Sequence, residues 1–257
     1  MIRARLRFHV ASATLLLFGY PALAFPQSSA QSSRFPAPEK LTYLVEWRLI
    51  NAGTATVQLA RDSASKGWTF NVHIESAGLV SRLYRVVDTY KVSTSDRFCL
   101  SNSVLDAQEG KKHTTTKLSV DSARKRVAFE ERDLIRNTTE KKELDIAPCT
   151  YEIVGALAAF RTLSLEPGGS TVFPITDGKK FAHARLTAES KEKLSVEGKS
   201  YSTTRYEAFL FDNVLYKRRG RLLMWISDDA DHLPVQFRLL MGFPIGTVTI
   251  SLQKQER

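Results

Sequence analysis

An alternation of apolar and polar residues with a period of two runs through most of this chain and is clearest near its C-terminal end. Residues Val235–Leu239 alternate in this way, and residues 247–252 repeat the pattern. Such a period places alternate side chains on opposite faces of a β-strand, so that one face meets a core. The turn-forming segments Asp228–Asp231 and Gly242–Gly246 interrupt it. The region 220–252 is therefore predicted to form three successive strands.

The same alternation predicts strands over most of the remaining chain. Further strands are expected at 41–49, 55–59, 68–75, 86–95, 98–106, 113–120, 126–132 and 139–146, with hairpins at Asp177-Gly178 and Glu197-Gly198 between 170 and 211.

Two segments break the pattern and predict helical structure. Residues 78–85 are expected to form a short helical turn. Residues 151–163 carry apolar side chains at helical spacing, with Thr150 as the expected N-cap and Pro167-Gly168-Gly169 as the stop. One apolar helix among about a dozen strands is most simply buried on the concave side of a curved sheet or barrel. The predicted fold class is therefore mainly β, with a single curved sheet or half-barrel and one packed helix.

The first 24 residues are expected to be a signal peptide and not part of the fold. Three arginines precede an apolar run from Ala13 to Tyr20, and Ala22-Leu23-Ala24 forms a cleavage site between Ala24 and Phe25. A retained membrane anchor is the competing interpretation. No cysteine follows the cleavage site, so a bacterial lipoprotein is not expected. We predict an exported, soluble and periplasmic protein.

The remaining chain divides into a leader and one domain. Residues 25–38 are rich in Ser, Gln and Pro, which predicts a disordered leader. Residues 39–257 are expected to form a single β-rich domain.

The charge of the mature chain is basic. Removal of three arginines and no acid lowers the net charge from +10 to +7. Because export argues against a nucleic-acid partner, anionic lipid head groups or acidic glycans are the more reasonable partners. A solvated basic surface without a partner is the alternative. The densest basic patch comprises Lys217, Arg218, Arg219 and Arg221, which would meet phosphate groups or an acidic partner, or would keep a sheet edge soluble.

Two cysteines, Cys99 and Cys149, remain in the mature chain. An even number in an oxidising compartment predicts a disulfide, which would stabilise the fold by about 4 kcal/mol in the chain-entropy model. A zinc site and a catalytic thiol are the weaker alternatives.

A catalytic centre is not evident in the sequence. The cluster Asp228–His232 has carboxylates for acid–base chemistry, but it lacks the pattern of a calcium loop, and a hydrogen-bonded turn explains it equally well. We predict no catalytic residue, no metal site and no cofactor.

Several segments together resemble a family of exported bacterial proteins known as domain of unknown function 3108. The matching pieces are Leu41-x-Tyr43-x-Val45-x-Trp47, Ala52-Gly53-Thr54-Ala55, Leu83–Tyr90, Ala159–Leu163, Asp177–Lys180, Trp225–Asp229, Leu233–Val235 and Ile245–Val248. The resemblance implies a curved antiparallel half-barrel, similar to lipocalin-like or lipoprotein-carrier barrels. It implies no activity and no catalytic residues.

These observations predict an exported cell-envelope protein that binds a lipid or another apolar ligand without catalysis. The residues expected to line the ligand site are Trp47, Tyr84, Leu157, Phe160 and Trp225. A protein–protein module in envelope or surface-polysaccharide assembly is the alternative, and a hydrolase that uses Asp228–His232 is a third possibility.

Overall fold

A computed structural model describes residues 35–257, so the predicted signal peptide and its Ala24–Phe25 cleavage site lie outside the described residues. The predicted leader extends to residue 38, but Phe35 is buried and its ring stacks on that of Phe98, with the centroids 5.9 Å apart. The last four residues of the expected leader therefore belong to the folded domain, because an aromatic side chain there completes the core.

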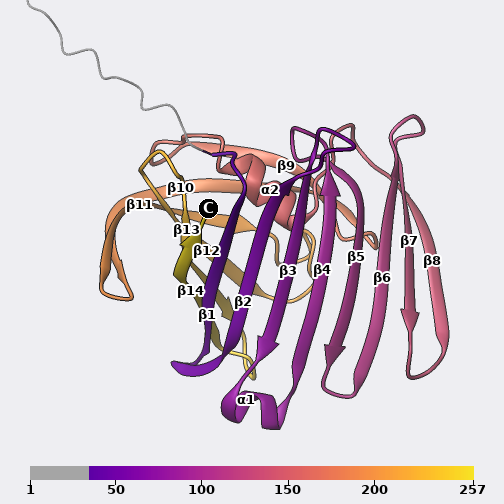
Figure 1. Cartoon of the computed structure of the whole chain (residues 1–257), viewed down its shortest axis with the longest axis horizontal. Helices are drawn as coiled ribbons and strands as arrows, with labels where there is room; N and C mark the ends of the chain where they lie inside the picture. Colours follow the sequence, from indigo (N-terminus) through magenta and orange to yellow (C-terminus); the bar gives the residue numbers. More distant parts are fainter. Residues whose placement is uncertain (1–34) are drawn as a thin grey trace, which may run out of the picture. The chain divides into compact units, whose positions relative to one another are not determined.

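Residues 35–257 fold into fourteen antiparallel strands and two helices, which confirms the predicted fold class (Figure 1). The strands are β1 (Glu39–Trp47), β2 (Ile50–Arg61), β3 (Trp68–Ser76), β4 (Val86–Thr94), β5 (Leu100–Glu109), β6 (Lys112–Asp121), β7 (Arg126–Asp133), β8 (Thr138–Asp145), β9 (Ser170–Thr176), β10 (Phe181–Val196), β11 (Lys199–Phe209), β12 (Gly220–Ser227), β13 (Pro234–Met241) and β14 (Thr247–Glu256). The helices are α1 (Gly78–Leu83) and α2 (Ile153–Phe160).

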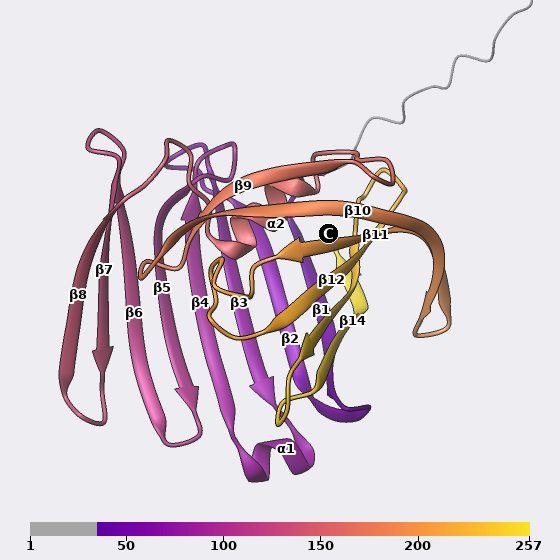
Figure 2. The ribbon, with the colours of Figure 1, turned by 180° about the vertical axis from the view of Figure 1, so that it is seen from behind.

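All fourteen strands belong to one sheet whose order contains a single long crossover. The order is β8-β7-β6-β5-β4-β3-β2-β1-β14-β13-β12-β11-β10-β9. The chain therefore runs outward by hairpins from β1 to β8, crosses through α2 to the opposite edge at β9, and returns by hairpins until β14 pairs with β1. In Figures 1 and 2, β9, β10 and β11 cross the wall formed by β1–β8 near the end that holds α2.

The crossover joins the two halves of the sheet, which are β1–β8 and β9–β14. The Thr150 carbonyl accepts a hydrogen bond from the Leu100 amide at the start of β5, and the Tyr151 amide donates to the Pro174 carbonyl of β9. Tyr151 also forms an isolated parallel bridge with Ile175. Because this short segment bonds to both halves, the sheet is curled into an unclosed, barrel-like form.

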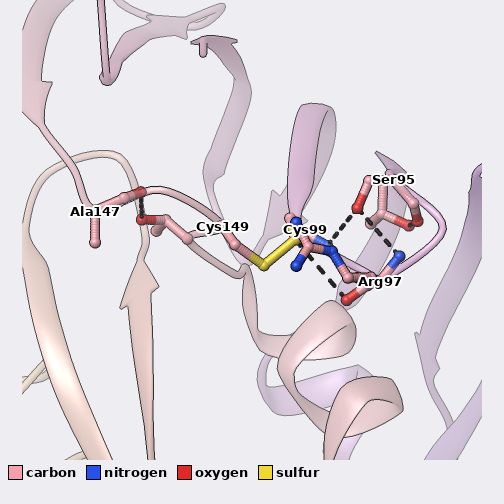
Figure 3. The surroundings of a disulfide bond; sticks show 7 residues. Ser95, Arg97, Cys99, Ala147 and Cys149 are labelled. Atoms are coloured by element: carbon pink, nitrogen blue, oxygen red, sulfur yellow. Dashed lines mark hydrogen bonds between the residues drawn. A yellow bond between two sulfur atoms is a disulfide. The ribbon is translucent and has the colours of Figure 1, made fainter. Parts of the chain in front are cut away.

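The predicted disulfide Cys99–Cys149 is present beside this seam (Figure 3). Its Cα atoms lie 4.7 Å apart, and Cys149 immediately precedes the segment that bridges β5 and β9. The bond therefore fastens the crossover to the start of β5.

A second contact between the two edges of the sheet lies at the turn that follows β9. The β9–β10 turn lies on β6–β8, where Lys179 forms an ion pair with Glu131 at 2.9 Å and lies over the ring of Phe129. The packing at Gly178 is tight, since a Cβ atom built there would lie 2.2 Å from the Leu118 side chain.

Helix α2 is shorter than the predicted 151–163. It cannot begin at Tyr151, because that residue is extended and bridged to β9. Glu152 rather than Thr150 is the N-cap, and its carboxylate accepts a hydrogen bond from the Val154 amide at 2.9 Å. At the other end a tighter turn follows Phe160, where the Leu163 amide donates to the Phe160 carbonyl.

Candidate ligand-binding cavity

A cavity of about 370 Å³ lies between the two halves of the sheet and α2. This volume is within the range of about 300–1,000 Å³ that is typical of small-molecule sites. Its lining comprises Tyr43, Ala55, Val57, Val72, Ile74, Ile153, Val154, Ala156, Leu157, Phe160, Phe173, Ile175, Ala184, Arg185, Leu186, Ala208, Leu210, Phe211, Tyr216, Leu222, Met224, Phe237, Leu239 and Ile250. The one charged residue among them, Arg185, stacks its guanidinium group 4.3 Å from the ring centroid of Phe209. The cavity is therefore suited to an apolar ligand.

Helix α2 supplies two of the five residues that the sequence suggested for the lining. Leu157 and Phe160 both border the cavity. Phe160 is held edge-on by Tyr206, with the ring centroids 4.7 Å apart, and it is almost fully buried. Leu157 is half-buried because it faces open space and not a close-packed wall.

Trp47 and Tyr84 lie away from the cavity lining, at the end of the sheet opposite α2. The indole nitrogen of Trp47 donates to the Ile245 carbonyl at 2.5 Å, which joins the β1–β2 and β13–β14 turns. Tyr84 follows α1 and is exposed. Strand alternation assigns a face to a residue but does not say how far along the strand the cavity extends, so these two positions differ from the expectation.

Trp225 lies on the outer face of the sheet. Its neighbours Met224 and Ile226 belong to the inner core, which directs Trp225 the opposite way. The indole nitrogen donates to the Glu192 carboxylate at 2.7 Å, and the Arg238 guanidinium lies over the ring. The inward assignment from the sequence is wrong because β12 is apolar on both faces, so alternation cannot choose between them.

A buried carboxyl group, that of Glu152, lies at the start of α2. Burial raises the pKa of Glu152 to about 7, and hydrogen bonds from the Val154 and Ile153 amides and from Tyr90 oppose this increase. Burial also raises the pKa of Tyr216, which lines the cavity, to about 12, and the charge of Glu152 adds to that effect. A Glu directly before an apolar helix was the available signal, but nothing in the sequence shows that it is buried.

A buried ion pair closes the end of the sheet at which α2 ends. Arg161 contacts Glu39 of β1 at 2.5 Å, and both side chains are buried. The same guanidinium donates to the carbonyls of Asp231 and His232 and stacks on the ring of Phe35. These contacts join α2, the start of β1 and the β12–β13 turn.

The Asp228–His232 cluster serves mainly as hydrogen-bonding scaffold for that turn. Asp229 accepts hydrogen bonds from the Ser227 hydroxyl and the Asp231 amide, and Asp228 accepts one from the Thr204 hydroxyl at 2.7 Å. Asp231 pairs with Arg257 at 2.6 Å. Within residues 35–257, no group of three or more His, Cys, Asp or Glu side chains is arranged to hold a metal ion.

The predicted basic patch is divided by the structure. Lys217, Arg218 and Arg219 are exposed in the loop before β12. Arg221 instead pairs with Glu207 on the outer face, at 2.6 Å, so its charge is already compensated. The same described region contains no helix that is long and apolar enough to cross a bilayer.

Two solved structures of bacterial proteins are similar to this chain to different degrees. A β-barrel-like protein of domain of unknown function DUF1849 from Brucella abortus superposes with a TM-score of 0.56 at 8% identity, covering 85% of this chain and 97% of its own. An inferred exported protein with a YmcC-like fold from Bacteroides fragilis is matched more weakly, with a TM-score of 0.36, 6% identity and coverage of 85% and 95%. No curated protein matches the chain. The family model described as "Protein of unknown function (DUF3108)" matches residues 42–253, and the chain belongs to that family.

Proposed function

We propose that this protein is an exported, non-catalytic binding protein of the cell envelope that holds one apolar or amphipathic ligand, such as a lipid acyl chain. The observation that carries the proposal is the cavity of about 370 Å³ with its nearly uncharged lining. Apolar ligands enter such a site because burial removes their surface from water, at about 25 cal/mol per Å².

The residues at the cavity edge support an amphipathic ligand. Tyr216 lines the cavity with a largely buried hydroxyl group, which can hydrogen-bond a polar head that enters the cavity. Ile74 lines the cavity as well, and both residues are partly exposed. The cavity lining therefore includes partly exposed residues on β3 and on the loop that follows β11.

A cavity-filling substitution tests this proposal. Ala156 on α2 lines the cavity and is half-buried, so Ala156→Phe would occupy space that is now open. The control is Val104→Phe, because Val104 is exposed on β5 and does not line the cavity. Both variants and the wild-type protein are purified from a bacterial periplasm and analysed by native mass spectrometry, followed by lipid extraction.

Wild-type protein and Val104→Phe should carry a bound lipid at near one per chain, whereas folded Ala156→Phe should carry much less. A folded wild-type protein without lipid would reject the proposal. If that lipid-free protein also bound defined envelope proteins, the assembly-module alternative would be favoured.

A further inference from the structure

Most of the large exposed apolar side chains in residues 35–257 lie at one end of the sheet. This end, which we call the open-end rim, comprises the connections 48–49, 77–85, 110–111, 134–137 and 242–246. In Figures 1 and 2, α1 and these turns lie at the end of the strands opposite α2. The most exposed of its side chains are Phe243 (94%), Leu49 (88%), Leu83 (69%) and Ile135 (67%).

Contacts between adjacent turns join the rim into one surface. Arg48 donates to the Pro244 carbonyl at 2.7 Å, which connects the β1–β2 and β13–β14 turns. The Ala77 amide donates to the Ala52 carbonyl, and Gly110 lies against the Tyr84 ring. The rim is therefore a continuous edge and not a set of isolated residues.

The composition of the rim is unusual for hairpin turns. Tight turns normally carry Gly, Asn or Asp, which adopt positive φ at low cost. In the β1–β2 turn, however, Arg48 and Leu49 have φ values of 50° and 69°. An exposed leucine in this conformation is unfavourable both for the backbone and for its contact with water.

The charges of the rim are all of one sign. Its connections contain Arg48, Arg82, Arg85, Lys111 and Arg136 and no acidic residue. Acidic residues occur only within the adjoining strands, at Glu46, Glu75, Glu109 and Asp133.

The turns at the α2 end differ clearly. They contain Asp62, Asp96, Asp228, Asp229 and Asp231 together with Lys66, Arg97, Arg124 and Lys125, so both signs of charge are present. Leu163 is the one large exposed apolar residue among the described residues of these turns. The rim turns are therefore apolar and cationic, whereas the turns at the α2 end are polar and of mixed charge.

We propose that the open-end rim docks on an anionic lipid bilayer, with Leu49, Leu83 and Phe243 inserted at the head-group boundary and the arginines paired with lipid phosphates. Exposed aliphatic and aromatic side chains surrounded by cations are the combination that binds this interface. The cavity wall reaches the same end of β3 at Ile74, so docking would bring the cavity next to the lipid. The inference goes beyond the proposed function and does not require an occupied cavity.

Vesicle sedimentation with matched variants tests the rim. The rim variant is Leu49→Gln/Leu83→Gln/Phe243→Gln. The control is Val104→Gln/Leu163→Gln/Val172→Gln, which removes three exposed apolar side chains elsewhere. Each purified protein is mixed with vesicles of phosphatidylethanolamine and phosphatidylglycerol, or of phosphatidylcholine alone.

Wild-type protein and the control should bind the anionic vesicles. The rim variant should bind at least about tenfold more weakly, because it lacks three apolar side chains that the wild-type protein would bury in the bilayer. Arg82→Gln/Arg85→Gln should reduce the preference for anionic over phosphatidylcholine vesicles, and added salt should do the same. Brominated acyl chains should quench Trp47, which lies at the rim, and Trp47→Phe should remove that quenching.

Three outcomes would overturn the inference. These are no binding of the wild-type protein to anionic vesicles, equal losses in the rim and control variants, and a concentration-dependent dimer without vesicles that the rim variant abolishes. Ala156→Phe should still bind vesicles like the wild-type protein, so failure of the cavity proposal and failure of rim docking remain distinguishable.

Discussion

At the scale of single residues, the buried charged groups lie at both ends of α2. Glu152 caps its start and Arg161 follows its end, and both are buried. Arg161 has a full set of partners in Glu39 and two carbonyl groups. Glu152 has hydrogen bonds but no cation among the groups that affect its pKa, so its ionised form is costly.

The raised pKa of Glu152 predicts that the contribution of this residue to stability decreases as pH increases. The folded-state pKa is about 7 against a usual 4.5, so the ionisation cost is absent below pH 4.5, grows between these values and is complete above pH 7. Glu152→Gln should therefore match the wild type at pH 4.5 and exceed its free energy of unfolding by about 3 kcal/mol at pH 8. Urea unfolding at both pH values measures this difference.

The control for Glu152→Gln is Glu197→Gln, in the exposed β10–β11 turn, which makes the same change in net charge. An equal gain in both variants would mean that net charge, and not the burial of Glu152, causes the effect.

At the scale of elements, the crossover between β8 and β9 decides how the sheet curls. Its Thr150–Tyr151 segment bonds to β5 and β9, and the Cys99–Cys149 disulfide holds it in place. Gly155 allows α2 to lie close to this seam, because a Cβ atom there would be 2.7 Å from the Phe98 carbonyl oxygen.

Cys149→Ser should lower stability without abolishing the fold. The disulfide closes a loop with a sequence separation of 50, for which chain entropy predicts about 4 kcal/mol. The hydrogen bonds of the seam and the apolar core remain, so the circular dichroism of the folded variant should be unchanged. Denaturant unfolding should show the loss, and reduced wild-type protein should match the variant. A reduced wild-type protein with an unchanged midpoint would contradict the prediction.

At the scale of the whole domain, contacts between strands far apart in the sheet maintain the cavity. The β9–β10 turn rests on β6–β8 through Gly178 and Lys179. These contacts keep the wall that carries Phe173 and Ile175 opposite the wall that carries Val57 and Val72.

Gly178→Ala should lift the β9–β10 turn from β6 and β7. A Cβ atom at Gly178 would clash with the side chains of Leu118 and Phe129, and its φ of 85° adds backbone strain. Gly198→Ala is a matched control, because Gly198 has φ 72° but no atom within 4 Å of such a Cβ. We expect Gly178→Ala to cost about 1–3 kcal/mol more than the control, with faster amide exchange in β9. Equal costs would mean that only backbone strain matters.

The sequence by itself determined the local structure of this protein. The period of two predicts the strands, and the turn residues between them predict several of the hairpins. The helical spacing near Leu157 predicts α2, and the two cysteines predict their disulfide. The strands and the helix depend on neighbours within a few residues, so the local sequence pattern is sufficient to predict them. The disulfide follows from an even number of cysteines in a chain that is expected to be exported.

The tertiary structure alone decided the face of β12 and the extent of the cavity. Trp225 faces outward although both faces of its strand are apolar, and Trp47 and Tyr84 lie at the rim rather than in the lining. It also decided that Glu152 is buried and that the turns with exposed Leu49, Leu83 and Phe243 lie at one end. Each of these depends on which distant strands meet when the sheet curls. Such long-range packing is not encoded in any local sequence pattern.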